Sequence, residues 1–311
     1  MNNKQFDVVI PVARKDISFV HHVIKYVRRN IVGVSKIYVV TNKQNFGKMH
    51  YDASSENCIL LDENNLLEGL SFKQVSSYLK KAGGNIAQTG WYFQQLLKFA
   101  FSQTKYVSDY YLTWDADTLP LNKLSFFKDG KPLFTKKIEY HEPYFKTLSR
   151  LLSIERQVDF SFIAENMIFK SSVVKEMLAD IEKSTVLGNF WVEKVINACD
   201  FTDERGNLFS EFETYGNYCI KNHPGLYDFR QLNTFRAAGL IRGRYINKNI
   251  LNRLALDVTI ASFEMQDAPF PYNVPWTFER AKNKILRVLR NNLGGVNDTA
   301  FVTELSFSNI A

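Results

Sequence analysis

Apolar and polar residues follow one another along the first part of the chain in blocks that predict alternating strands and helices. Residues 6–12 form an almost continuous apolar run, which is typical of a strand buried on both faces of a parallel sheet. The next apolar positions recur at the spacing of an amphipathic helix: Phe19, Val20, Val23, Ile24 and Val27. Two more short apolar runs follow at 35–41 and 57–61. This order predicts a parallel α/β sheet.

The same pattern extends to about residue 265. Helical spacing predicts helices over 87–102, 171–183, 189–199 and 211–220. Apolar runs predict strands over 106–114, 131–135, 163–169 and 257–263. After a proline-rich stretch, residues 278–292 mix apolar and basic residues at helical spacing. We therefore expect one catalytic domain at 1–265 and a basic helical extension at 266–311.

The strand predicted at 106–114 leads directly into Asp115 and Asp117. Ligands of open α/β sheets bind beyond the carboxyl ends of the strands, which is where these side chains are expected. Alternate residues of a strand point the same way, so both carboxylates can approach one ion. Paired carboxylates suit Mg²⁺ or Mn²⁺, which also binds substrate phosphates. The alternative is a turn with two solvated aspartates.

Composition narrows the classes of protein that this chain can represent. Its 311 residues are 45% hydrophobic and 23% charged, which fits a soluble folded protein and excludes collagen-like and disordered classes. The net charge of +7 suits an anionic ligand such as a nucleotide, and is too small and dispersed to indicate nucleic acid. Three scattered cysteines and the absence of a long apolar stretch lead us to expect a cytoplasmic protein.

Three motifs together resemble a known family. They are Gly-Trp-x-x-Gln-Gln-x-x-Lys at 90–98, Asp-x-Asp at 115–117 and Ser-Glu-Phe-x-x-Tyr-Gly at 210–216. Their order and spacing resemble nucleotide-sugar glycosyltransferases of the GT-A fold, and in particular a bacterial group found around capsule and lipopolysaccharide assembly. The resemblance covers about residues 5–265. It implies a Rossmann-like, mostly parallel sheet flanked by helices, followed here by a C-terminal helical appendage.

The resemblance also implies a donor and metal site. Mn²⁺ or Mg²⁺ would be held by Asp115 and Asp117, with His223 as a candidate further ligand. The implied donor-binding residues are Pro11, Arg14, Asp16, Asn42, Gln95, Lys98 and Asp115. Simpler explanations stay open for several of them, because Asp16 could cap the following helix and Gln95 and Lys98 could lie on a solvated helix face.

The acceptor side has its own candidates. An inverting transfer needs a carboxylate to take the proton of the attacking hydroxyl, and Glu211 is the first choice, with Glu213 second. An acidic first helical turn, favoured by the helix dipole, is the alternative explanation for both. The implied acceptor-binding residues are His141, Glu165 and Asn166.

The sequence thus predicts a metal-dependent glycosyltransferase that moves a sugar from a nucleoside diphosphate donor, UDP first, to a surface polysaccharide or lipid-linked glycan. A nucleotidyltransferase is one alternative, although residues 11–16 lack the glycine-rich phosphate loop that it would need. A non-catalytic nucleotide- or glycan-binding module is another. Residues 278–292 could contact the inner membrane surface or pack on the domain. The sequence leaves open whether the transfer inverts or retains.

Overall fold

The computed structural model describes residues 4–49, 58–202, 206–274, 277 and 281. Its centre is a five-stranded sheet in the order β10-β5-β1-β3-β4. These strands are β1 (Phe6–Pro11), β3 (Val34–Thr41), β4 (Cys58–Asp62), β5 (Tyr110–Trp114) and β10 (Asn166–Lys170). β1 pairs in parallel with β3 and β5, β3 pairs in parallel with β4, and β10 alone runs antiparallel.

This topology brings the carboxyl ends of the parallel strands and the amino end of β10 to the same edge of the sheet. The carboxyl ends of β1, β3 and β5 lie there because these strands are parallel. The antiparallel β10 brings its first residue to the same edge, where Asn166 pairs with Trp114. The backbone N–H of Asp115 then donates to the carbonyl of Glu165 at 3.0 Å. The polar residues that follow β5 and those that precede β10 therefore lie close together at this edge of the sheet.

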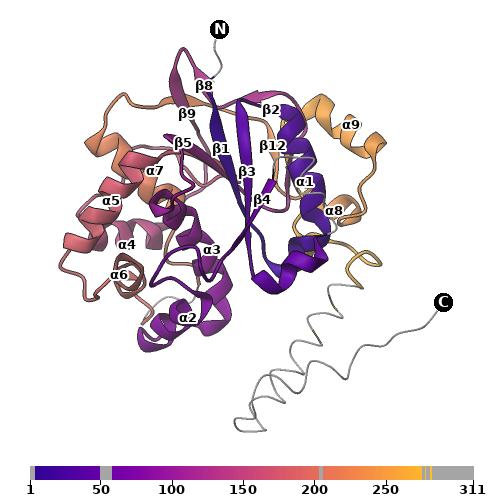
Figure 1. Cartoon of the computed structure of the whole chain (residues 1–311). Helices are drawn as coiled ribbons and strands as arrows, with labels where there is room; N and C mark the ends of the chain where they lie inside the picture. The colour runs from indigo at the N-terminus through magenta and orange to yellow at the C-terminus, as the bar shows by residue number, and fades with distance from the viewer. Residues whose placement is uncertain (1–3, 50–57, 203–205, 275–276, 278–280, 282–311) are drawn as a thin grey trace.

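Helices flank the sheet, with α1 to one side and α3, α5 and α7 to the other (Figure 1). The described helices are α1 (Ile17–Asn30), α2 (Phe72–Lys81), α3 (Thr89–Ala100), α4 (Glu142–Leu152), α5 (Ser171–Lys183), α6 (Trp191–Ala198), α7 (Glu211–Asn222), α8 (Gly239–Arg242) and α9 (Lys248–Asp257). Most of α3 is buried between the sheet and α2 and α7, which explains why its polar residues matter for the site.

Short strands outside the main sheet hold the segment after β5. They are β2 (Ile31–Val32), β6 (Thr118–Pro120), β7 (Leu124–Ser125), β8 (Phe127–Lys128), β9 (Lys131–Thr135), β11 (Asp228–Arg230), β12 (Thr234–Phe235) and β13 (Ile260–Ser262). β13 pairs with β6, and the N–H of Phe263 donates to the carbonyl of Asp117 at 2.8 Å. Residues 260–263 thus fix the turn that carries both aspartates.

The predicted fold class is confirmed, since a mostly parallel sheet is flanked by helices. The prediction missed α2, α4, α8 and α9. It also began β5 four residues early, at 106 rather than Tyr110. The predicted helix at 278–292 lies outside the described residues apart from residue 281, so the division at 265 stays a prediction. Within the described part of the chain, no helix is long and apolar enough to cross a membrane.

Candidate active site

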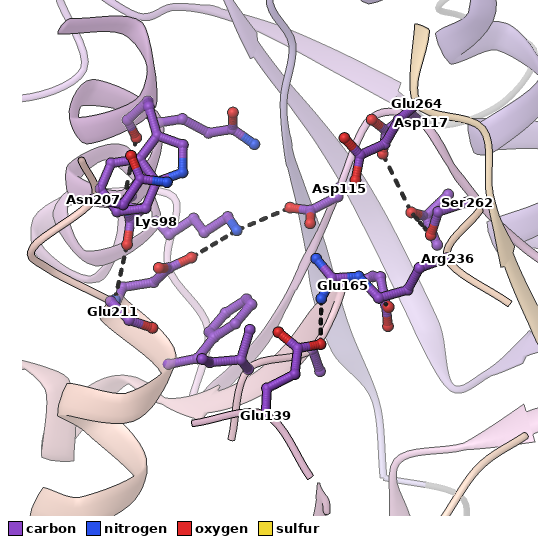
Figure 2. Close-up of a pocket in the computed structure, with 18 of the residues that line it drawn as sticks. Lys98, Asp115, Asp117, Glu139, Glu165, Asn207, Glu211, Arg236, Ser262 and Glu264 are labelled. Atoms are coloured by element: carbon purple, nitrogen blue, oxygen red, sulfur yellow. Dashed lines mark hydrogen bonds and ion pairs between the residues drawn. The ribbon is translucent and has the colours of Figure 1, made fainter. Parts of the chain in front are cut away.

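A cavity of about 630 Å³ opens at the edge of the sheet where β5 ends. Its walls come from the turn after β5, from α3, from the start of α7 and from the segment around β13 (Figure 2). These elements are far apart in the sequence, and the parallel topology brings them together. A concave site with several ionisable groups at a strand end is where chemistry is expected in an α/β protein.

Lys98 of α3 bridges two carboxylates that line this cavity. Its Nζ lies 2.7 Å from Oε1 of Glu211 and 2.9 Å from Oδ1 of Asp115 (Figure 2). The residue is only 3% exposed. Burial alone would lower the pKa of Lys98, but the carboxylates of Asp115 and Glu211 outweigh it and raise this pKa above its usual value. Lys98 is therefore a buried, permanently charged ammonium group.

Glu211 is the first residue of α7, and its position is fixed from two sides. Ser210 caps the helix, its Oγ accepting from the N–H of Glu213 at 3.2 Å. The Oε1 of Gln95 accepts from the N–H of Glu211 at 3.1 Å. Burial raises the pKa of the Glu211 carboxyl, while the charge of Lys98 opposes this shift. The result is a carboxylate held beside the cavity at a helix N-terminus, where a negative charge is favoured.

Asp117 has less positive charge near it than Asp115 has. The closest cation among the described residues is Arg244, with 3.9 Å between its Nη2 and Oδ2 of Asp117. Burial, together with the carboxylates of Asp115 and Asp16, raises the pKa of Asp117 to about 7. These carboxylates repel one another, so an added cation would stabilise their charged forms.

The residues present fit a divalent ion that is held partly by its substrate. Within the described parts of the chain, no three His, Cys, Asp or Glu side chains gather as a metal site. Asp115 and Asp117 could supply two oxygen ligands. Mg²⁺ and Mn²⁺ commonly keep several waters and complete their coordination with substrate phosphates, so two carboxylates are chemically sufficient.

A second charged cluster lies on the far side of the cavity. Arg236 forms ion pairs with Glu139 and, at 3.3 Å from its Nε, with Glu165. Lys137 also lies 3.3 Å from Glu165. The Glu165 side chain is only 4% exposed, yet the residue lines the cavity. His141 also lines the cavity, with its Nε2 2.8 Å from the carbonyl of Asn207.

A smaller cavity of about 370 Å³ adjoins the first at Gln94, which lines both. It lies beyond the carboxyl ends of β1 and β3 and contains Pro11, Arg14 and Asn42. The predicted donor residues thus separate into two neighbouring groups. The second group, in the main cavity, is Asp16, Gln95, Lys98 and Asp115. Asp16 occupies the N-cap position of α1, but its side chain makes no capping hydrogen bond, so the alternative explanation that it caps this helix is not borne out.

Three predicted site residues lie outside both cavities. Glu213 is 1% exposed and its carboxylate accepts from Ser161 and from the backbone of Phe162, so it stabilises the interior. Asn166 is buried at the start of β10. His223 follows the C-terminal end of the 12-residue α7, about 18 Å along the helix from Glu211, and contacts Glu176 at 3.0 Å. The structure therefore does not bring His223 to Asp115 and Asp117.

Sequence reasoning missed the residues that the later segment contributes. Arg236, Ser262 and Glu264 line the cavity, and Arg244 binds Asp16 at 2.5 Å beside it. These residues belong to no recognisable motif. The one available signal was Glu264, which follows a predicted strand end much as Asp115 does.

Comparisons with known proteins give a family and several distant structures. A comparison with curated proteins gives no significant match. The apo glycosyltransferase GlyE of Streptococcus pneumoniae TIGR4 has 13% identity and a TM-score of 0.39, with 86% of this chain and 56% of that chain covered. This chain therefore spans little more than half the length of GlyE. Apo mouse xyloside xylosyltransferase 1 has 11% identity and a TM-score of 0.42, covering 86% and 100%.

An active-site mutant of LgtC has 13% identity and a TM-score of 0.45, covering 83% of this chain and 86% of that chain. The family model described as "Family of unknown function (DUF6492)" matches residues 6–230, which include β1, the two aspartates and α7. Since that match covers most of the chain, the protein belongs to the DUF6492 family.

Proposed function

We propose that this protein is a metal-dependent glycosyltransferase of the GT-A type, which transfers a sugar from a nucleoside diphosphate donor to a glycan. The observation that carries the proposal is the arrangement of Asp115, Lys98 and Glu211 around one cavity. Asp115 and Asp117 line this cavity, and the buried carboxylate of Glu211 is joined to Asp115 through Lys98. A metal-dependent, inverting sugar transfer from a diphosphate donor can use these groups.

The donor fits the two adjoining cavities. The nucleoside would occupy the smaller one, beside Asn42 and Arg14, and the diphosphate would reach Asp115 and Asp117. A divalent ion held by these aspartates would neutralise the diphosphate as it leaves. UDP is the first donor to test, and manganese the first ion.

The acceptor would enter from the other side of the main cavity. Glu211 would take the proton of the attacking hydroxyl in an inverting transfer. Lys98 touches Glu211 and Asp115 and would hold both at fixed positions, so it acts as a positioning residue. Glu165 and His141 would contact the acceptor sugar. The glycan is proposed to belong to a surface polysaccharide or a lipid-linked oligosaccharide.

The test is UDP release from a panel of UDP-sugars with Mn²⁺, combined with calorimetric titration of UDP in the presence and absence of Mn²⁺. Asp117→Asn should abolish metal-dependent UDP binding and turnover. It should not lower stability, because the native carboxylate is held against the repulsion of its neighbours. Glu182→Gln, at an exposed position on α5, is the matched control. Wild-type UDP binding by Asp117→Asn would contradict the proposed site.

A further inference from the structure

A groove on the outer face of α4 lies next to the main cavity. Residues of α4 from Glu142 to Arg150 line it at spacings of three and four, so they share one helix face. Glu155 and Arg156, which follow the helix, form the opposite wall. Glu165, His141 and Glu211, the residues proposed for the acceptor side of the cavity, do not line this groove.

Tyr140 connects the groove to the cavity, because it lines both. Its side chain is 58% exposed and stacks on Phe145, with 5.4 Å between ring centroids and 17° between planes. On the cavity side, Trp91 and Tyr144 stack at 6.5 Å and 18°. Aromatic faces therefore continue from the cavity into the groove. Such faces offer large rigid apolar surface, which suits the C–H faces of successive sugars.

Arg156 is the cation best placed to meet a ligand in the groove. Its guanidinium lies 4.9 Å from the ring centroid of Tyr140 and 5.4 Å from that of Phe145. Its Nη2 donates to the carbonyl of Phe160 at 3.3 Å, and its buried Nε has no hydrogen-bond partner among the described residues. A guanidinium held next to aromatic rings is well suited to bind a carboxylate or phosphate.

The charges of the cavity and the groove differ. Of the described residues, seven carboxylates and three cations line the cavity. The carboxylates are Asp16, Asp115, Asp117, Glu139, Glu165, Glu211 and Glu264. Three cations, Lys146, Arg150 and Arg156, line the groove with two carboxylates. Lys146 pairs with Glu142 at 3.4 Å and Arg150 pairs with Asp200 at 2.8 Å, so Arg156 is the groove cation with no carboxylate partner among the described residues. The cavity disfavours negative charge beyond the donor diphosphate, whereas the groove accepts it at Arg156.

We propose that the groove binds an anionic group of the acceptor, which is an oligosaccharide. Its reacting hydroxyl lies in the cavity near Glu211, its chain crosses Tyr140, and its carboxylate or phosphate lies at Arg156. This inference rests on the proposed function for the identity of the cavity's substrate. The groove itself defines the acceptor class: a negatively charged oligosaccharide rather than a neutral sugar.

The test measures binding of three probes to the full chain without donor, by calorimetry at low salt. The probes are maltotetraose, maltotetraose 1-phosphate and tetragalacturonate. We expect the two anionic probes to bind about 10- to 100-fold more tightly than maltotetraose, the usual effect of one charge-assisted hydrogen bond. The difference should shrink as salt rises. The phosphate and carboxylate probes identify which anion is preferred.

Variants distinguish binding in the groove from nonspecific electrostatic attraction of the probes to the protein. Arg156→Gln should remove most of the preference for anionic probes, Arg156→Lys should restore part of it, and Lys175→Gln on exposed α5 should leave it unchanged. Thermal unfolding checks that each variant is folded. Equal binding of neutral and anionic probes, or an unchanged preference in Arg156→Gln, would overturn the proposal. If the protein releases UDP from a donor but binds none of the probes, the groove proposal fails and the proposed function stands. If it binds the anionic probes but turns over no donor, the proposed function fails and the groove proposal stands.

Discussion

Replacing Lys98 with methionine tests the network at the centre of the site. Methionine keeps most of the side-chain volume and removes the charge. Asp115 can regain hydration, because its side chain is 27% exposed, but that of Glu211 is only 5% exposed. The cost of the substitution should therefore come mainly from Glu211. Removing one partner of a buried ion pair usually costs about 3–5 kcal/mol.

The pH dependence of this loss can be derived from Glu211. Without Lys98, burial raises its pKa in the folded state far above the unfolded value. Such a carboxyl favours folding below its unfolded pKa, and this advantage is lost as pH rises toward the folded pKa. The protein can avoid a buried unpaired charge by protonating Glu211. Relative to an unfolded pKa of ~4.3, protonation costs about 1 kcal/mol at pH 5 and about 5 kcal/mol at pH 8. We therefore expect Lys98→Met to lower the free energy of unfolding by close to these two amounts at pH 5 and pH 8.

The assay is urea unfolding of wild type and Lys98→Met at pH 5 and pH 8. We expect the variant to lose several times more free energy of unfolding at pH 8 than at pH 5. Adding Glu211→Gln to Lys98→Met should recover much of the loss and remove its pH dependence, since no buried charge is then unpaired. Lys175→Met on exposed α5 controls for loss of a lysine. A loss below about 1 kcal/mol at pH 8, or full additivity of the two substitutions, would refute the reasoning.

Three further predictions concern stability and are checked by the same urea titrations. Gly216→Ala should cost about 2 kcal/mol or more, because its Cβ would lie 2.4 Å from the ring of buried Phe162, whereas Gly47→Ala, with open space around it, should be nearly neutral. Arg244→Gln should cost about 3 kcal/mol and Arg244→Lys less, since the partly buried guanidinium neutralises a buried carboxylate; equal losses would argue against a charge effect. Burial raises the pKa of Glu63 to about 7, so wild type should lose stability between pH 5 and 8 relative to Glu63→Gln, by about 1–2 kcal/mol after solvent screening; parallel pH curves would contradict this.

Much of the part of the site at the ends of β1, β3 and β5 could be predicted from sequence because it follows local rules. A continuous apolar run predicts a buried strand, and the ends of parallel strands meet at one edge. These rules place Pro11, Asn42 and Asp115 near one edge of the sheet, whereas a donor-binding role for Pro11 and Asn42 came from the resemblance. The helix 87–102 was also predictable, and its buried Lys98 was distinguished from a surface lysine by the resemblance alone.

The far side of the site could not be predicted, because pairing between distant segments decides it. Arg244 reaches Asp16 across 228 positions of the sequence. Arg236 and Glu264 line the cavity because β12 and β13 pair next to β6. β13 falls within the strand predicted at 257–263, but β12 is only two residues long, too short for a hydrophobic period to identify it, and no local pattern shows that the two strands pair. His223 and Glu213 were predicted for the site from their residue type and their place near a motif. Neither residue lines the cavity, so type and place in the sequence were not sufficient.

The buried charges themselves argue that the cavity, and not the fold, accounts for Lys98 and Glu211. A buried ion pair is often no more stabilising than apolar side chains of similar size, and the surrounding core is rich in aromatic rings that could fill the space. Lys98 even lies 4.3 Å from the ring centroid of Phe212. A sequence that needed stability alone had apolar options at this position. The three charges are better explained by a ligand of the cavity that they line, for which Lys98 holds both carboxylates in fixed positions.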